Sequence, residues 1–303
     1  MERSRFFMKS LANLLLGFWA FFGIMFFPFH VWGEDLAEVL ARGELRHLGL
    51  PYVNFISGAE DGFSAELIKG FADYLGVRYR FIPTSWDTIF QDILGREVFL
   101  EGTPISLGKT VPLRGDVIAM GFTVLPWRKE LLAFSDPTFV SQIWFLTRSD
   151  SSVTPIVPSG ILEEDIRRTK NKMKGLAVLG MKNTCVDPAL YSLENYGVRP
   201  VYFRGNFNDL APAMFKGEAD ATILDVPDSL VALEKWPGEI KIIGPVSPLQ
   251  NMAAAFRKDS PKLLQAFNDY LKEIREQGGY LELVKRYYPG VWHYFPDFFR
   301  DFQ

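Results

Sequence analysis

The chain has 303 residues, 48% hydrophobic and 23% charged, which is enough to bury one large core or two modest ones. The net charge is -3 at pH 7, and the sequence contains no cluster of basic residues. The composition therefore excludes binding to the phosphate backbone of nucleic acid. Cys185 is the one cysteine, which excludes an intrachain disulfide.

The N-terminus has the order of a secretory signal. Arg3, Arg5 and Lys9 precede an apolar stretch over residues 11–29, and the small residue Gly33 stands before an acidic start. A basic head, an apolar middle and a small residue are typical of a signal peptide, so we expect residues 1–33 to be removed and the protein to be periplasmic. The apolar stretch is nearly long enough to span a bilayer, so an uncleaved N-terminal anchor is the alternative.

Strand and helix patterns alternate along the first half of the body. Apolar residues recur at helical spacing from Phe63 to Leu75, and Gly76 ends that helix. The other elements predicted here are strands over 45–50, 77–81 and 116–120 and a short helix over 89–94. An apolar segment over 142–147 and a polar stretch over 149–159 follow.

A second series of the same kind follows the polar stretch. It predicts strands over 175–179, 200–203, 221–224 and 240–243, and helices over 189–196, 210–215 and 229–236. Asn208 is a candidate cap for the helix over 210–215. Ser260-Pro261 predicts the start of a last helix, because a hydroxyl cap followed by proline favours the first turn.

These patterns indicate an α/β fold with two lobes. Strands that alternate with helices predict parallel sheets covered by helices, and the polar stretch separates two such series. In open α/β sheets, ligands bind beyond the carboxyl ends of the strands. We therefore expect the functional residues in segments that follow strands and are rich in polar or aromatic residues, namely 52–55, 85–87, 121–128 and 224–225.

Short motifs in a fixed order resemble a known family. They are Leu45-Arg46, Gly62-Phe63, Glu66-Leu67, Trp86, Gly115-Asp116, Gly121-Phe122-Thr123, Arg128, Phe134-Ser135-Asp136-Pro137, Lys174-Gly175-Leu176-Ala177-Val178, Lys216-Gly217-Glu218-Ala219-Asp220-Ala221 and Asp225. No single motif is specific, but chance rarely supplies the whole ordered set. Over roughly residues 38–288 the chain resembles the periplasmic solute-binding proteins of the polar amino-acid class, family 3, which serve ABC transporters.

The resemblance implies an architecture and partners. It implies the type II periplasmic-binding-protein fold, with residues 34–140 plus 245–303 in lobe 1, residues 141–244 in lobe 2, and a two-segment hinge about which the lobes close. It also implies a monomer that captures an amino acid or similar small zwitterion and delivers it to an inner-membrane ABC transporter permease. We expect no cofactor, no metal, no catalytic residue and no nucleic-acid partner.

Arg128 matches the family position that binds the carboxylate of the solute. A guanidinium suits this role because its planar fork pairs with both carboxylate oxygens at once. A solvated surface arginine paired with Glu130 is the alternative. The resemblance places Gly121 and Thr123 beside it, where glycine lets backbone amides approach the ligand and the threonine adds a hydroxyl. An ordinary turn glycine is the alternative for Gly121.

Asp225 matches the residue that holds the ammonium of the solute, since a carboxylate supplies the opposite charge in a partly dry cleft. Its alternative is a helix cap before Val226-Pro227, and one residue can serve both roles. Asn183 and Thr184 fall near the loop that gives the family a second contact to the carboxylate. Residues 180–184 depart from the usual short turn, so which of the two contacts ligand stays open.

Tyr52 and Trp86 match the aromatic pair that encloses the side chain of the solute. Aromatic faces bury apolar stems and attract cations, at about 0.5–2 kcal/mol per contact. Core packing is the alternative for Trp86. Glu66 and Asp116 match acids that the family uses as structural supports.

Two segments depart from the family. Residues 96–114 form an insertion whose glycines and prolines predict a loop. The aromatic tail over 289–303 extends past the family's usual end, and we expect it to pack against lobe 1.

An enzyme is the alternative function. Some relatives of these binders are dehydratases that act on small carboxylic acids with a carboxylate in the same cleft, and Asp225 is the residue here that could serve. The three histidines, His30, His47 and His293, are far apart in the sequence and predict no histidine metal site.

Overall fold

The computed structural model describes residues 35–58, 61–100 and 105–300. The signal peptide predicted over residues 1–33 lies outside the described residues. Within the part that is described, no helix is both long and apolar enough to cross a membrane.

The first lobe is built on a mixed five-stranded sheet in the order β2 (Arg78–Pro83), β1 (Glu44–Gly49), β5 (Val117–Ile118), β12 (Gln250–Arg257) and β6 (Leu132–Ser141). β1 runs parallel to β2 and β5, whereas β12 runs antiparallel to β5 and β6. The strand predicted over 116–120 is confirmed only over two residues, as β5.

The second lobe has its own five-stranded sheet in the order β11 (Ile240–Pro245), β7 (Ile143–Arg148), β10 (Ala221–Asp225), β8 (Ala177–Gly180) and β9 (Arg199–Tyr202). β8 lies parallel to β9 and β10, and β7 lies antiparallel to β10 and β11. The parallel pairing predicted from the alternation is therefore confirmed for only part of each sheet, and both sheets are mixed. The antiparallel strands are the ones that carry the chain from one lobe to the other without a helix between them.

Two crossing segments join the lobes. The chain passes from β6 to β7 through Gln142 and returns from β11 to β12 through residues 246–249. The segments are tied to each other, because Gln142 Nε2 donates to the Ser247 carbonyl at 2.9 Å and the Ile143 amide donates to Ser247 Oγ at 2.9 Å. Such a pair of adjacent, hydrogen-bonded crossings is the geometry of a two-segment hinge.

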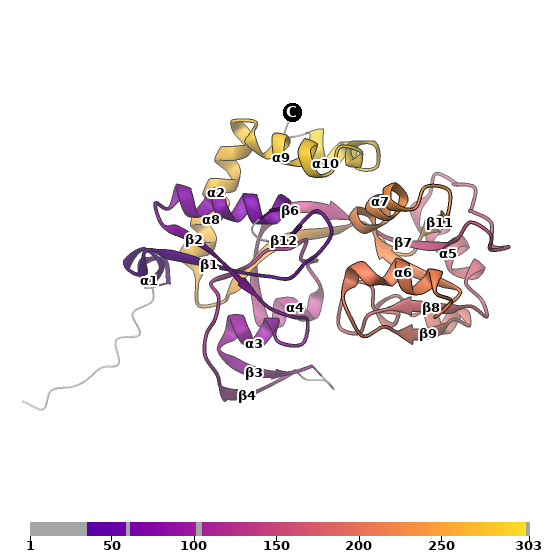
Figure 1. Ribbon diagram of the computed structural model, residues 1–303, viewed down its shortest axis with the longest axis horizontal. Helices are drawn as coiled ribbons and strands as arrows, with labels where there is room; N and C mark the ends of the chain where they lie inside the picture. Colours follow the sequence, from indigo (N-terminus) through magenta and orange to yellow (C-terminus); the bar gives the residue numbers. More distant parts are fainter. Residues whose placement is uncertain (1–34, 59–60, 101–104, 301–303) are drawn as a thin grey trace, which may run out of the picture. The chain divides into compact units, whose positions relative to one another are not determined.

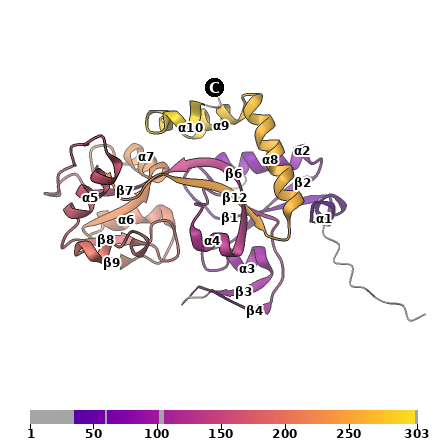
Figure 2. The same cartoon turned by 180° about the vertical axis from the view of Figure 1, so that it is seen from behind.

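Helices of the first lobe cover its sheet. They are α1 (Asp35–Arg42), α2 (Phe63–Tyr74), α3 (Ile89–Leu94), α4 (Pro126–Leu131), α8 (Pro261–Glu276) and α9 (Gly279–Tyr287). α2 and α8 lie side by side in Figures 1 and 2, and Phe71 of α2 meets Phe267 of α8 edge to face with 5.2 Å between ring centroids. The helices predicted over 63–75, over 89–94 and from Ser260-Pro261 are confirmed.

The second lobe holds α5 (Leu162–Lys172), α6 (Leu210–Phe215) and α7 (Val226–Lys235). The helix predicted over 189–196 is instead two 3₁₀ turns, Pro188–Tyr191 and Leu193–Tyr196, because Ser192 between them adopts a left-handed φ of 53°. The cap assigned to Asn208 is also wrong. Asn206 caps a 3₁₀ turn over Phe207–Asp209 that precedes α6, while Asn208 Oδ1 accepts the backbone amide of Val53 at 2.9 Å.

The insertion over 96–114 is a β-hairpin where a loop was predicted. β3 (Arg96–Phe99) pairs antiparallel with β4 (Ser106–Thr110), and Figure 1 shows the two strands next to α3. Arg96 donates to the Gly108 carbonyl across the pair. Gly108 lies within β4, where the register of the pair is irregular, and Pro112 follows the strand, so both are compatible with pairing.

The tail continues past α9 through a 3₁₀ turn, Val291–His293, into α10 (Pro296–Arg300). Phe299 lies 5.7 Å from the ring of Phe139 in β6, and Tyr294 lies 5.1 Å from Trp144 in β7. The tail therefore packs against the first lobe, as expected, and also against the first strand of the second. Two acids have the supporting roles that the resemblance implies, because Asp116 pairs with Arg42 and Arg46, and Glu66 pairs with Arg286.

Candidate functional site

The residues singled out in the sequence lie after the ends of strands. Tyr52 follows β1, Trp86 follows β2, and Gly121 and Thr123 follow β5 in the first lobe. In the second lobe Asn183 and Thr184 follow β8, and Asp225 ends β10. This is the edge at which open α/β sheets hold their ligands. Hydrogen bonds join Tyr52 to Asp225 and Arg128 to Asn183 across the two lobes.

Asp225 is a fully buried carboxylate that caps a helix. Its Oδ1 accepts the backbone amide of Asp228 at 3.1 Å, which makes it the N-cap of α7. Its Oδ2 accepts the hydroxyl of Tyr52 from the other lobe. Burial raises the pKa of Asp225, and these two hydrogen bonds oppose the rise. The carboxylate therefore has both the capping role and a second oxygen directed at the opposite lobe.

Arg128 is fully buried in α4, which contradicts the alternative of a solvated arginine. Nη1 donates to the Thr123 carbonyl at 2.9 Å, and Nη2 donates to the Asn183 carbonyl of the other lobe at 3.3 Å. Nε has no hydrogen-bond partner, and no carboxylate pairs with the guanidinium within the described residues. Burial lowers the pKa of Arg128 to about 10.

Aromatic rings surround the Arg128 guanidinium. Its Cζ lies 4.1 Å from the ring centroid of Phe122, 5.4 Å from that of Trp86 and 5.3 Å from that of Trp127. Cation–π contacts of this kind offset part of the cost of burying a charge. They leave the charge without an anion in a dry environment, which is the arrangement that favours an incoming carboxylate.

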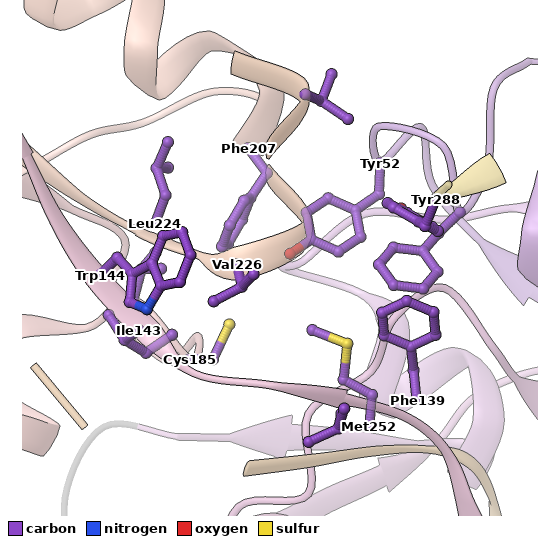
Figure 3. Packing of buried hydrophobic residues seen from close by; sticks show 14 of the residues in the cluster. Tyr52, Phe139, Ile143, Trp144, Cys185, Phe207, Leu224, Val226, Met252 and Tyr288 are labelled. Carbon is purple, nitrogen blue, oxygen red and sulfur yellow. The ribbon is translucent and has the colours of Figure 1, made fainter. Parts of the chain in front are cut away.

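No direct ring contact joins Tyr52 and Trp86 in the described part of the chain. Phe207 of the second lobe contacts both, edge to face with Tyr52 at 4.9 Å and tilted to Trp86 at 6.0 Å. Figure 3 shows Phe207 beside the Tyr52 ring, with the Tyr52 hydroxyl directed toward Val226, the residue after Asp225. Trp86 is half-buried and stacks on Phe122 at 6.2 Å, so it also takes part in packing.

Asn183 and Thr184, the two candidate residues in the loop after β8, differ in whether they are free to contact Arg128 or a ligand. The Thr184 hydroxyl donates to the Met181 carbonyl at 2.7 Å within its own loop. Asn183 has a left-handed φ of 63° and presents its carbonyl to Arg128. Asn183 is thus the member of the pair that the structure brings to Arg128, through its backbone. The Thr123 hydroxyl is buried and has no hydrogen-bond partner among the described residues.

Gly121 fills a position that other residues cannot occupy without strain. Its φ is 70°, and a Cβ there would come within 2.5 Å of Phe55 Cε2 and 2.9 Å of Tyr52 Cε1. We expect Gly121→Ala to lower the free energy of unfolding by about 2–4 kcal/mol, because strain and overpacking add. Gly175→Ala is the control, since Gly175 has a φ of 82° and open space around it. Equal losses in urea unfolding of both variants would contradict the packing role.

Asp228 belongs to the site and was not singled out in the sequence. It is 4% exposed, and neither of its carboxylate oxygens has a hydrogen-bond partner among the described residues. Burial and the nearby Asp225 charge raise its pKa. The helix predicted over 229–236 begins three residues earlier than expected, at Val226, which places Asp228 in its first turn. A helix start at Val226-Pro227 was the signal that could have found it.

Cys185 is a second group near Asp225 that was not singled out in the sequence as part of the site. The buried Cys185 thiol is 4.0 Å from Asp225 Oδ2, and burial raises its pKa to about 12. Tyr191 donates its hydroxyl to the Cys185 carbonyl and accepts Gln250 Nε2 at 3.1 Å. Among the residues that the structure describes, no group of three or more histidine, cysteine or acidic side chains is arranged to hold a metal ion.

A cavity of about 590 Å³ lies beside this polar cluster, between the two lobes. Trp86 and Asn183, which both contact the Arg128 guanidinium, form part of its wall. The lining residues are Leu50, Pro51, Thr84, Ser85, Trp86, Asp87, Met181, Lys182, Asn183, Phe203, Arg204, Gly205 and Asn206. A cavity of this size with a few polar groups is typical of small-molecule binding sites.

Two α/β lobes, a two-segment hinge and a polar cluster between them define a two-lobed solute-binding protein. A family model for bacterial extracellular solute-binding proteins, family 3, matches residues 113–290. Since this stretch is more than half of the chain, the chain belongs to that family.

Curated relatives include binding proteins and one enzyme. Over 234 residues the chain is 26% identical to membrane-bound lytic murein transglycosylase F of Desulfosudis oleivorans, covering 76% of this chain and 44% of that protein, so it spans less than half of that relative's length. It is 22% identical over 236 residues to the L-cystine-binding protein TcyJ of Escherichia coli, covering 76% of this chain and 75% of that protein. The arginine-binding extracellular protein ArtP of Bacillus subtilis is 22% identical over 234 residues, with 76% and 78% covered.

Solved structures show the same fold. A mutant of ArgBP from T. maritima superposes with a TM-score of 0.67 at 25% identity, covering 84% of this chain and 99% of that one. The ancestral amino acid-binding protein AncCDT-1, a precursor of cyclohexadienyl dehydratase, has a TM-score of 0.65 at 23% identity, with 84% and 98% covered. These similarities confirm the two-lobed type II fold.

Proposed function

We propose that this chain captures an amino acid or similar small zwitterion between its lobes and delivers it to a membrane ABC transporter. One observation carries the proposal, namely that Arg128 is fully buried and lacks an anionic partner among the described residues. A buried charge is costly unless it is paired. The carboxylate of a solute would supply the pair, and the planar guanidinium would bind both of its oxygens.

Asp225 is the proposed partner of the ammonium. Its Oδ2 accepts the Tyr52 hydroxyl, a neutral donor from the other lobe. An ammonium at this position would replace a neutral hydrogen bond by a charge-assisted one, which is roughly twice as strong. Tyr52 then acts as the donor that the ammonium displaces, rather than as one face of an aromatic pair.

Export and lobe motion complete the proposal. Residues 1–33 would be the signal peptide of a periplasmic monomer, and N-terminal sequencing of the exported protein would show a start near Glu34. Residues 34–140 plus 245–303 would move as one lobe and residues 141–244 as the other, about the segments tied together at Gln142 and Ser247. An inner-membrane permease would receive the closed, loaded form. The family's extracellular members and the amino acids named for its relatives support this assignment.

A thermal-shift screen over the free amino acids tests the ligand class. We expect at least one amino acid to raise the melting temperature by several degrees, because a ligand at a hundredfold excess over its Kd stabilises the folded state by about 2.7 kcal/mol. Sugars, divalent metals and oligonucleotides serve as controls and should leave the melt unchanged. A shift with these compounds but with no amino acid would sink the proposal.

A dehydratase-like enzyme acting on a small carboxylic acid is the second candidate. The observation that favours it is the buried pair Asp225 and Asp228, since burial raises the pKa of both and so helps one of them to hold a proton for acid catalysis. Recovery of the bound compound by mass spectrometry separates the two functions. A binding protein returns its ligand unchanged, whereas an enzyme returns a product that has lost water.

A further inference from the structure

Phe207 of the second lobe is connected to both charged anchors of the proposed site, Arg128 and Asp225. Its ring meets that of Tyr52 edge to face at 4.9 Å, and the Tyr52 hydroxyl donates to Asp225 (Figure 3). The same ring lies 6.0 Å from that of Trp86, which in turn lies 5.4 Å from the Arg128 guanidinium. A zwitterionic head held by the two anchors would therefore lie beside Tyr52 and Trp86, and Phe207 fills the space between those two rings.

The backbone around Phe207 holds its ring in this position. Phe207 opens the 3₁₀ turn Phe207–Asp209, and Asn206 caps that turn by accepting the Asn208 amide at 3.0 Å. Asn208 Oδ1 accepts the Val53 amide of the first lobe at 2.9 Å. The Phe207 side chain is only 1% exposed. Moving this turn away from the first lobe would therefore cost a hydrogen bond between the lobes as well as the burial of the ring.

Little free space remains around Phe207. The cavity that it lines together with Val53 and Asp228 has a volume of about 20 Å³, which is room for about one water molecule. The larger cavity of about 590 Å³ does not add to this space, since its described wall includes neither Phe207 nor either charged anchor. A side chain no larger than a methyl group matches the space that is left, whereas a longer one would overpack a site that the ring already fills.

We infer that Phe207 restricts the solute to amino acids with a small side chain, such as glycine and L-alanine. When the lobes close over a bound head, Phe207 enters between Tyr52 and Trp86 and excludes any side chain that needs the same volume. A clash of this kind discriminates against the wrong ligand without a new contact to the right one. The inference rests on the proposed function, because it assumes that Arg128 and Asp225 hold the head.

Amino acids that share one head and differ in the size of their side chain test the inference by titration calorimetry. The probes are glycine, L-alanine, L-valine, L-leucine and L-phenylalanine. We expect the parent protein to bind glycine or alanine most tightly. Leucine and phenylalanine should bind at least about tenfold more weakly, because a single methylene in a packed pocket already changes affinity by about that factor.

Phe207→Ala should reverse this order of affinities. Loss of the ring leaves an apolar cavity of the kind that takes up a benzene ring, so phenylalanine should bind at least about tenfold more tightly to the variant than to the parent protein. Phe207→Leu keeps more of the packing and should show a smaller gain for leucine, which provides the test if Phe207→Ala does not fold. The matched control is Phe71→Ala, which removes a fully buried ring that packs on Phe267 and Tyr270 in the first lobe. It should lower stability and leave the order of affinities unchanged.

The outcomes separate this inference from the function on which it rests. If the parent protein binds leucine or phenylalanine as tightly as alanine, Phe207 does not limit the size of the solute, although amino-acid capture stands. An unchanged order of affinities in both Phe207 variants, or the same reversal in Phe71→Ala, would overturn the inference in the same way. Failure of every amino acid to bind the parent protein and the Phe207 variants would overturn the proposed function as well.

Discussion

Replacing Arg128 by methionine should abolish tight binding of the solute while leaving the protein folded. A carboxylate that enters the closed cleft without its cationic partner is desolvated and unpaired, which typically costs about 2–5 kcal/mol. This corresponds to roughly thirtyfold to several-thousandfold weaker binding. Methionine retains the apolar contacts of Arg128 with the surrounding rings and removes a buried charge that has no anionic partner in the described residues. We therefore expect the free energy of unfolding of Arg128→Met to stay within about 1 kcal/mol of that of the parent protein.

Two further variants sharpen this test. Arg128→Lys should recover only part of the affinity, because an ammonium cannot pair with two carboxylate oxygens in a planar fork. Arg128→Ala should also lower stability, since the side chain is fully buried and its loss leaves a cavity. The exposed Lys129→Ala is the control and should bind like the parent protein. If calorimetry finds parental affinity in Arg128→Met, the carboxylate anchor lies elsewhere.

Asp225→Asn should stabilise the unliganded protein and abolish the rise in melting temperature that the solute causes. Burial raises the pKa of Asp225 to about 6, whereas an aspartate in an unfolded chain titrates near 3.9. The folded protein therefore holds this proton more tightly, and the free energy of unfolding falls as the pH rises from about 4 to about 6. Asparagine does not ionise, so the variant should lack this fall and be about 1–3 kcal/mol more stable at pH 7. Urea unfolding at pH 4, 5, 6 and 7 measures the difference.

Asp228→Asn is the matched control for this experiment. It also removes one carboxylate of the buried pair, and it leaves the cap of α7 and the proposed ammonium site in place. We expect it to be stabilised at pH 7 as well, but to keep its melting shift with the amino acid. If Asp225→Asn keeps the shift too, Asp225 does not hold the ammonium. If Asp225→Asn is less stable than the parent protein at pH 7, the hydrogen bonds that Asp225 accepts from the Asp228 amide and from Tyr52 outweigh the cost of burying its charge.

The sequence predicted the helices and strands that have a recognisable hydrophobic pattern within their own segment. β2, α2 and α8 were located because each has apolar residues at a regular period, and β1, β8 and β10 because each is a short apolar run. It missed β6 and β12, which lie together at the hinge. β6 contains Pro137, which argues against a strand, and β12 contains three consecutive alanines, which have low strand propensity. It also missed α5, whose sequence is almost entirely polar.

The candidate site was predicted in its residues but not in its contacts. Asp225 was found because it ends an apolar strand before a proline, and Arg128 was found by resemblance. No local pattern links Tyr52 to Asp225, since 173 residues separate them. The position of Phe207 between Tyr52 and Trp86 likewise depends on how two separate chain segments meet. Burial of Arg128 runs against the usual exposure of arginine and follows only from the aromatic rings around it.

The hydrogen bonds between the lobes have a kinetic consequence. Tyr52 bonds to Asp225, Val53 to Asn208, and Gln250 to Tyr191, and each bond joins a residue of the first lobe to one of the second. A solute cannot reach Arg128 or Asp225 until such contacts separate. The association rate is then limited by how often the lobes part, and it falls below the 10⁵–10⁷ M⁻¹s⁻¹ that is typical of docking onto an open surface. The same contacts re-form behind the solute when it leaves, so each release returns the protein to a state that excludes water from its buried carboxylates.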